Sequence, residues 1–339
     1  MSFPLKFVEA GAPEGGGTTG TTGTTGTGLA RAVEAAGPGK VYAVHSFRHL
    51  GDSVICAGAV HNVKVAHPEL MFAYVGHAPE VWENNPDVVH RDIPPPDVYL
   101  PRLHYGSTEL ERTAARGTVV EGFTATLCDL LGIPPVPAST RAPYAVLSDA
   151  EKERALSWRG AVLLNANGQT SSFSKFYPHW QEVVDALRGE FPIIQVGSRE
   201  RRNISIDLKG VDDWRGRTEN LRELMVMAAG CAGILSPPSG LVNLAAAFGQ
   251  RGVVVNGARE LAALTAYPGM VHVSMEYTPC NSGKDWACIA LHETGNRSCR
   301  RPIMVWELDE RRCAECMADL DPLAIAEAAR KVLRAGWKP

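Results

Sequence analysis

Residues 235–249 read LSPPSGLVNLAAAFG, in which two prolines and a Ser-Gly pair separate a short apolar run from an Ala-rich helical one. Proline continues neither a central strand nor a helix interior, so the chain has to turn sharply at Pro237 and Pro238. Ser239 is a good helix N-cap, and Gly240 lets another group approach the backbone closely. The stretch predicts a buried strand, a tight turn and a helix whose first N–H groups form an anion site. The alternative is that Ser239 only caps its own helix, and the local pattern favours neither.

The strand-helix rhythm of this stretch repeats along most of the chain. Apolar runs of strand length alternate with helical segments in residues 40–131 and again in residues 161–257. Strands that alternate with helices in this way form parallel sheets flanked by helices. We therefore expect an α/β protein with two doubly wound domains, residues 40–150 and 151–339.

The ends of the chain depart from this rhythm. Residues 1–39 contain a strand-like piece at 5–9 and the Gly/Thr-rich sequence GGGTTGTTGTTGTG at 15–28, which is typical of a flexible linker. Residues 278–317 are rich in cysteine and loop-like. Residues 321–337 predict a terminal amphipathic helix.

Composition narrows the class of protein. With 339 residues the chain is too long for one ordinary core, and with 45% hydrophobic and 21% charged residues it has ample apolar mass to bury. A formal net charge of -3 gives no broad basic surface for nucleic acid. No apolar run approaches the ~18 residues of a membrane span, and the N-terminus lacks a signal-peptide pattern, so we expect a cytoplasmic protein.

Five of the eight cysteines gather near the C-terminus, where a cytoplasmic chain keeps its thiols reduced. They predict a tetrahedral thiolate site for structural Fe or Zn, built from four of the five, which would pin a long insertion without its own core. The alternative is free buried cysteines, which polar loops of this kind do not favour. The five candidates are Cys280, Cys288, Cys299, Cys313 and Cys316.

Four segments occur in an order that carries a family resemblance. They are GDSVICAGAVHNVKVAHPEL (51–70), SKFYPHW (174–180), IIQVGSRE (193–200) and ENLRELMVMAAGCAGILSPPSGLVNLAAAFGQRGVVV (219–255). Together they resemble glycosyltransferase family 9, the ADP-heptose heptosyltransferases. The resemblance implies a GT-B fold, in which two Rossmann-like domains face each other across a cleft. The acceptor would bind mostly to the first domain and the nucleotide sugar to the second.

The resemblance also implies roles for individual residues. Inverting sugar transfer needs a base for the acceptor hydroxyl and fixed positive charge for the leaving diphosphate. Asp52, at a strand-to-helix turn, matches the family base, and Lys175 matches the lysine on the donor phosphates. The other donor-binding candidates are Ser171, Ser172, Ser198, Glu200, Ser239, Gly240 and Leu241.

Each of these residues also has an ordinary structural interpretation. Asp52 alone reads as a helix N-cap, and Lys175 as a solvated surface charge. Ser171 and Ser172 are common turn formers, and Glu200 lies in a charged run typical of a solvated surface.

One feature of the sequence departs from the family pattern, and another is similar to one subgroup of the family. Many family members carry Asp and His where this chain has Pro238 and Asn243, which puts a lipopolysaccharide specificity in doubt. CNSGKDWAC, residues 280–288, is similar to the bacterial autotransporter heptosyltransferases, which hold an iron through cysteines in this region. One cysteine of that pattern is Gly283 here, and the Cys313 and Cys316 pair would replace it.

The resemblance as a whole implies transfer of heptose from ADP-heptose to a Ser or Thr hydroxyl of a protein, with no metal needed for transfer. Homo-oligomer formation is left open. Alternatives are another nucleotide sugar, a saccharide, lipid or nucleic-acid acceptor, and a catalytically degenerate GT-B binding subunit.

Overall fold

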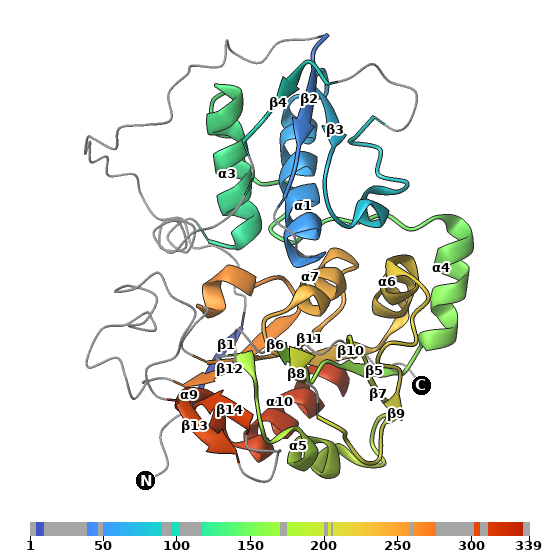
Figure 1. Ribbon diagram of the computed structural model, residues 1–339, viewed down its shortest axis with the longest axis vertical. Helices are drawn as coiled ribbons and strands as arrows, with labels where there is room; N and C mark the ends of the chain where they lie inside the picture. The colour runs from blue at the N-terminus through green and yellow to red at the C-terminus, as the bar shows by residue number, and fades with distance from the viewer. Residues whose placement is uncertain are drawn as a thin grey trace, which may run out of the picture.

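The computed structural model describes residues 5–9, 39–46, 50–89, 96–101, 103, 117–169, 175–199, 203–204, 206–257, 261–275, 302–305 and 311–334. These residues form two α/β lobes that lie one above the other along the long axis of the molecule (Figure 1). No helix among them combines the length and the apolar character needed to cross a bilayer.

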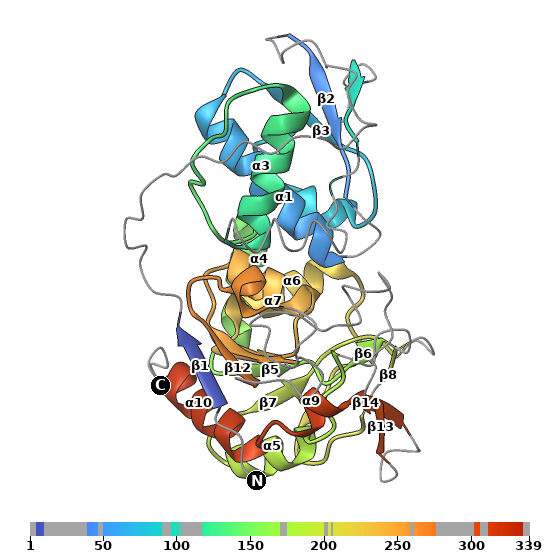
Figure 2. The same ribbon diagram turned by 90° about the vertical axis from the view of Figure 1, so that its left-hand side faces the viewer.

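The first lobe is a small parallel sheet covered by two helices. The strands β3 (Met71–Tyr74), β2 (Val41–Val44) and β4 (Val98–Tyr99) lie in that order. The helices α1 (Leu50–Ala66) and α3 (Val119–Leu131) pack against each other on one side of the strands (Figure 2). The short 3-10 helix η1 (Pro79–Trp82) follows β3.

Helix α3 shows how the sequence sets its own limits. Thr118 and Glu121 form a reciprocal capping box at its start. At its end Gly132 adopts φ +63°, a left-handed conformation that favours glycine and stops the helix where the sequence predicts.

The second lobe is a doubly wound sheet of seven described strands. In spatial order they are β1 (Leu5–Glu9), β12 (Met270–Met275), β11 (Gly252–Asn256), β10 (Gly233–Ser236), β5 (Val162–Leu164), β7 (Ile193–Gln195) and β9 (Asp212–Asp213). Helices α6 (Leu221–Gly230) and α7 (Gly240–Ala247) lie on the side facing the first lobe, and α5 (Trp180–Leu187) and α10 (Pro322–Arg334) on the other (Figure 1).

Burial of both sheet faces explains why β5 and residues 253–255 of β11 are apolar at every position. Val254 of β11 belongs to the hydrophobic cluster that includes α1, α3, α6 and α7, whereas its neighbours Val253 and Val255 belong to the cluster with α5 and α10. Such strands have no polar side to show to water. The first of these clusters also contains Tyr42 and Val44 of β2, so one apolar core runs from the first sheet into the second lobe.

The N-terminal strand belongs to the second lobe. A strand at residues 5–9 is confirmed, and it pairs antiparallel with β12 at the sheet edge, with Leu5 opposite Met275. The chain therefore leaves the second lobe before it builds the first one at residues 41–44. The linker predicted at residues 15–28 lies outside the described residues.

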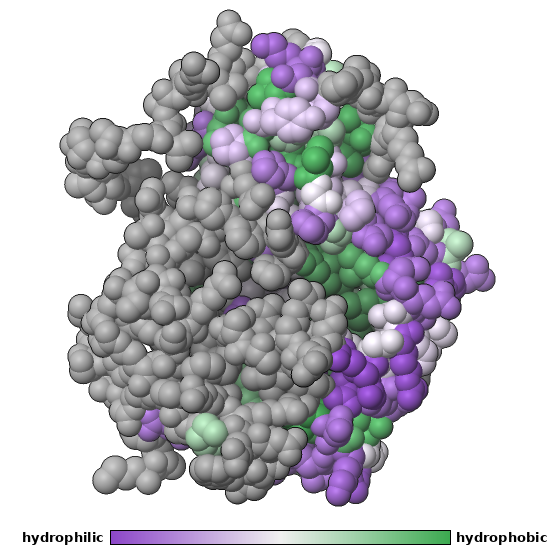
Figure 3. Space-filling model, in the orientation of Figure 1, coloured by the Kyte–Doolittle hydropathy of each residue, from purple (hydrophilic) through white to green (hydrophobic). Residues whose placement is uncertain are grey.

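Several elements were not predicted. A Ser-x-x-Glu capping box, Ser148 with Glu151, starts α4 (Asp149–Ala155) and was an available signal. Exposed polar residues of this helix lie on the hydrophilic outer edge of the molecule (Figure 3). The other unpredicted elements are the strands β9 and β12 of the main sheet, together with η2 (Leu156–Trp158), β6 (Gly168–Gln169), β8 (Asn203–Ile204), η4 (Ala262–Thr265), β13 (Pro302–Val305), β14 (Arg311–Ala314) and α9 (Glu315–Ala318).

Arg222, on α6, joins the two lobes through a buried guanidinium group. The residue is 7% exposed. Its Nη1 donates to the carbonyl oxygen of Glu80 in the first lobe at 2.9 Å, and its Nη2 donates to Val146 O between the lobes, also at 2.9 Å. Its Nε donates to Glu151 Oε1 at 2.7 Å. This hydrogen-bonded guanidinium lowers the pKa of Glu151 to about 2.

Replacing Arg222 with Met is expected to destabilise the fold, because it removes the guanidinium that pairs with the Glu151 carboxylate and donates to two buried carbonyl oxygens. We expect a loss of about 3 kcal/mol in the free energy of unfolding, measured in urea. Arg188→Met removes an exposed ion pair with Asp185 and should change it by less than about 0.5 kcal/mol. Equal losses for the two variants would contradict this role.

The difference between wild type and Arg222→Met should also depend on pH. The folded pKa of Glu151, about 2, lies below its ordinary value of 4.5, so the ion pair contributes fully above pH 4.5. The contribution is lost as the pH falls from 4.5 towards 2. A difference that stays constant over this range would argue against the ion pair.

Candidate active site

The first turns of α1 and α7 meet where the two lobes touch (Figure 1). A Cβ atom placed on Gly240 would lie 3.2 Å from Leu50 Cδ2 and 3.5 Å from the backbone nitrogen of Gly51. A Cβ atom placed on Gly51 would lie 3.6 Å from Gly240 Cα. The two backbones therefore approach each other closely because both positions are glycine.

The start of α7 follows the pattern that its sequence predicts, with one difference at Ser239. Strand β10 ends at Ser236, the prolines turn the chain, and Ser239 is the N-cap residue by its backbone. Its side chain makes no capping hydrogen bond, because its Oγ lies 2.8 Å from Ser236 Oγ instead. The interpretation that Ser239 merely caps its own helix is therefore wrong.

The uncapped first turn of α7 can receive an anion. Ser239 and Gly240 are both partly exposed, whereas the Leu241 side chain is buried in the core. The N–H groups of Gly240 and Leu241, the first two residues of the helix, have no acceptor within it, and here the N-cap side chain supplies none. With the positive end of the helix dipole, they form a site suited to phosphate oxygens.

Asp52 lies in the first turn of α1 and follows Gly51, whose backbone approaches Gly240. The helix begins at Leu50, so Asp52 is inside the helix, and both the predicted turn and the N-cap interpretation are wrong for this residue. The helix starts earlier than its apolar pattern suggested, and its first residues, Leu50 and Gly51, lie against Gly240 of α7. Asp52 is 8% exposed. Its carboxylate is stabilised by the positive end of the α1 dipole.

A buried polar cluster fixes the turn that carries Asp52. Ser53, which is fully buried, accepts a hydrogen bond from Trp82 Nε1 at 2.9 Å and donates to Tyr74 OH at 3.3 Å. The Tyr74 and Trp82 rings stack with centroids 4.4 Å apart. Trp82, 3% exposed, packs inside the lobe and holds α1 against η1.

The carboxyl ends of β7, β5 and β10 lie at one edge of the second sheet, because these strands are adjacent and parallel. Ser198 follows β7, and its carbonyl oxygen accepts from Nδ2 of Asn167, which follows β5, at 2.9 Å. Ser239 follows β10. Ligands of such sheets bind at this edge, so the structure groups Ser198 with the start of α7.

Asn167 is a residue that sequence reasoning missed. A Cβ atom on Gly197, whose φ is +134°, would lie 2.3 Å from Asn167 Nδ2. Asn167 and Gly197 together thus fix the course of the loop that contains Ser198. The signal was the NAN sequence at the end of a predicted strand.

Of four further predicted donor-side residues, the structure describes only Lys175. Lys175 is half-buried and lies ahead of α5. Ser171, Ser172 and Glu200 lie outside the described residues.

Two of the five candidate metal ligands are described. Cys313 on β14 and Cys316 on α9 are 0% and 7% exposed, and neither forms a disulfide. Cys316 Sγ would lie 3.2 Å from a Cβ atom on Gly257, which follows β11. Within the described ranges no group of three or more His, Cys, Asp or Glu side chains is arranged for a metal ion. Cys280, Cys288 and Cys299 lie outside the described residues.

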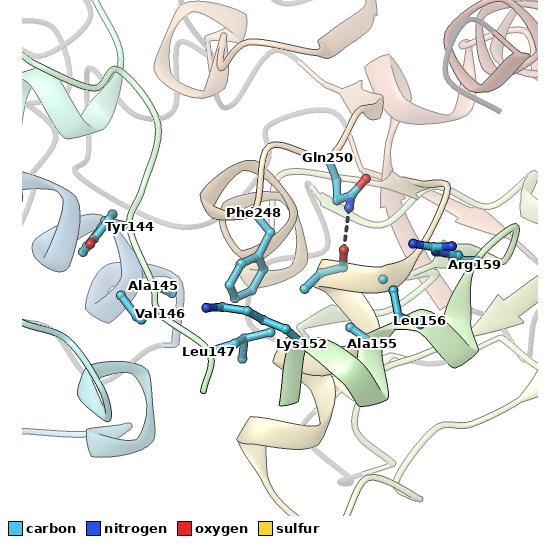
Figure 4. A pocket seen from close by; sticks show the side chains of 12 residues that line it. Tyr144, Ala145, Val146, Leu147, Lys152, Ala155, Leu156, Arg159, Phe248 and Gln250 are labelled. Carbon is cyan, nitrogen blue, oxygen red and sulfur yellow. Dashed lines mark hydrogen bonds between the residues drawn. The ribbon is translucent and has the colours of Figure 1, made fainter. Parts of the chain in front are cut away.

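A pocket of about 460 Å³ lies at the other end of α7. It is lined by residues 144–147, by α4, and by the ends of α6 and α7 at Ala229 and Phe248 (Figure 4). Because Phe248 follows the last residue of α7 and Gly240 is the first, this pocket is separate from the turn that holds Asp52.

Sequence comparisons with known proteins give no match, either to a family model or to a curated protein. Comparisons with solved structures do give matches. The chain has the fold of family 9 glycosyltransferases. A family 9 glycosyltransferase from Veillonella parvula matches with a TM-score of 0.59 and 12% identity over 88% of this chain and 98% of its own.

Two further structures agree. The E. coli ADP-heptose lipopolysaccharide heptosyltransferase II matches with a TM-score of 0.57 and 13% identity, over 87% of this chain and 99% of its own. The iron-containing dodecameric glycosyltransferase TibC of enterotoxigenic E. coli matches with a TM-score of 0.56 and 16% identity, over 89% and 78%. The expected α/β fold with parallel sheets is confirmed, and its structural neighbours are GT-B-like glycosyltransferases.

Replacing Gly197 with Ala is expected to destabilise the loop after β7. The change adds left-handed backbone strain and a collision with Asn167, which together cost about 2 kcal/mol. Gly249→Ala is a matched control, because Gly249 has φ +69° but nothing within 4 Å of an added Cβ. Urea unfolding should therefore show the larger loss for Gly197→Ala, and equal losses would contradict the collision.

Proposed function

We propose that this protein is an inverting glycosyltransferase that moves a heptose from ADP-heptose to a hydroxyl acceptor. The observation that carries the proposal is the contact of α1 with α7, which brings Asp52 beside the uncapped first turn of α7. The donor assignment is supported by the structural likeness to a named ADP-heptose heptosyltransferase and to TibC. TibC is also known in complex with ADP-D-β-D-heptose, and that structure matches with a TM-score of 0.54.

The reaction needs one acid-base step and one displacement. Asp52 accepts the proton of the acceptor hydroxyl as its oxygen forms a bond to the anomeric carbon. The bond from that carbon to the diphosphate oxygen breaks on the opposite face, and the electron pair stays with the diphosphate. The configuration at the anomeric carbon inverts.

The leaving diphosphate is stabilised by fixed positive charge. The N–H groups of Gly240 and Leu241 at the start of α7 and the ammonium of Lys175 are the donors that we assign to its oxygens. Ser198 belongs to the same edge of the sheet and would contact the nucleoside. Because these groups supply the charge, the proposal requires no metal ion for transfer.

The acceptor that we propose is a Ser or Thr hydroxyl of a protein. Its support is the similarity of the cysteine-rich segment to the autotransporter heptosyltransferases. The likeness to dodecameric TibC supports a homo-oligomer as well. We place the protein in the cytoplasm, where nucleotide sugars are available to such enzymes.

We further propose that a structural Fe or Zn is held by four thiolates. Cys313 and Cys316 suit this role, because their buried sulfurs follow the Cys-x-x-Cys spacing common at such sites. The remaining two ligands would come from the three cysteines outside the described residues. The metal would supply a covalent staple between this segment and the second lobe.

Replacing Asp52 with Asn tests the assignment of the base. The amide keeps the shape of the carboxylate but accepts no proton, so transfer should fall by about 10²-fold or more. Binding of ADP, measured by calorimetry, should persist. Lys175→Ala should weaken ADP binding as well as transfer, because the lysine is assigned to the diphosphate. If Asp52→Asn transfers at the wild-type rate, the assignment of Asp52 as the base fails. If the wild type binds ADP but transfers no sugar, the binding-subunit alternative is favoured.

The donor is tested by incubating the protein with a panel of nucleotide sugars and measuring nucleotide release and product mass. The proposal predicts release of ADP from ADP-heptose. A preference for a UDP sugar would overturn the heptose assignment while leaving the roles of Asp52 and Lys175 in place.

The metal is tested by elemental analysis of reduced protein. We expect about one Fe or Zn per chain, with less metal in Cys313→Ser and Cys316→Ser, and a lower Tm after chelation. Cys231→Ser is a control, because Cys231 is buried on its own and burial raises the pKa of its thiol to about 12. Wild-type protein that contains no metal would remove this proposal.

A further inference from the structure

Asn243 of α7 reaches the first turn of α1. Its side chain is almost fully buried, and its Oδ1 accepts a hydrogen bond from Tyr267 OH at 2.9 Å. Tyr267 is itself fully buried. The hydroxyl therefore fixes which way the amide points, and Nδ2 is directed away from Tyr267. A Cβ atom on Gly51 would lie only 2.7 Å from that nitrogen.

This geometry makes Asn243 a spacer between the lobes. The amide occupies the space that a side chain at residue 51 would need, so the first turn of α1 can come no closer. On the opposite side of the same contact, Leu50 lies against Gly240. Two side chains therefore interlock the lobes: Leu50 of α1 lies against Gly240, and Asn243 of α7 lies against Gly51. Both contacts involve the residues that immediately precede Asp52.

We infer that Asn243, held by Tyr267, is a positioning residue that sets the distance between the turn carrying Asp52 and the first turn of α7. The spacing is a property of the fold alone. Its catalytic consequence rests on the proposed function, in which the two turns hold the base and the diphosphate. A change of about 1 Å between reacting groups can lower a rate by about 10²-fold.

A double-mutant cycle tests the spacing without any substrate. Gly51→Ala is expected to lower Tm by about 2 °C or more, because the new methyl group meets the Asn243 amide. In an Asn243→Ala background the same change should cost much less. Val242→Ala is the control background, because it truncates a buried side chain next to Asn243 in sequence. In that background Gly51→Ala should lower Tm as much as it does in wild type. Equal costs in all three backgrounds would overturn the inference.

Transfer kinetics test the consequence for the reaction. Tyr267→Phe removes the hydroxyl that orients the amide, so kcat is expected to fall about tenfold while the KM for the donor stays the same. Gly51→Ala should also lower kcat, and Asn243→Ala should restore part of it in the double variant. An unchanged kcat in Tyr267→Phe would overturn the positioning role. Absence of transfer by the wild type would refute the proposed function, and the Tm cycle would then decide the spacing by itself.

Discussion

The close approach of two helix starts is the constraint on which the rest of this structure depends. Each helix carries about half a positive elementary charge at its first turn, so bringing α1 and α7 together is unfavourable unless negative charge lies nearby. Asp52 supplies one such charge from within α1. A diphosphate at the uncapped start of α7 would supply more. The two glycines, Gly51 and Gly240, are the sequence features that permit the contact.

The rest of the interface holds this contact in place. One hydrophobic core continues from β2 through α1 and α7 to the second sheet. Arg222 then ties α6 to the first lobe and to the residues between the lobes through buried hydrogen bonds. Three contacts therefore join the second lobe to the first: the shared apolar core, the buried Arg222 guanidinium, and the meeting of the first turns of α1 and α7. Fixed donors that need no rearrangement are what an enzyme uses to stabilise developing charge.

The sequence predicted most elements because strand and helix periods are local signals. The turn at Pro237 and Pro238 and the helix after it follow directly from proline and glycine chemistry. The start of α1 was placed too late, because Leu50 and Gly51 carry no strong local helix signal and lie against α7, which is distant in sequence. The pairing of Leu5 with Met275 and the contacts of Arg222 also join residues that are distant in sequence, so no local pattern predicts them.

Predictions about the site divide in the same way. Gly51, which precedes Asp52, and Gly240, which follows Ser239, come together because the fold joins two local motifs. The side chain of Ser239 could not be placed from sequence, since its choice between Ser236 and the helix depends on the geometry of the proline turn. Asn243 appeared in the sequence only as a departure from a family pattern. Its bond to Tyr267 shows instead that the residue is integrated into the lobe contact.

The most direct measurement is an experimental structure of the protein with ADP bound. The account predicts that diphosphate oxygens lie within hydrogen-bonding distance of the N–H groups of Gly240 and Leu241, on the side that faces Asp52. ADP seated elsewhere, for example in the pocket lined by Phe248 and residues 144–147, with the start of α7 empty, would contradict it.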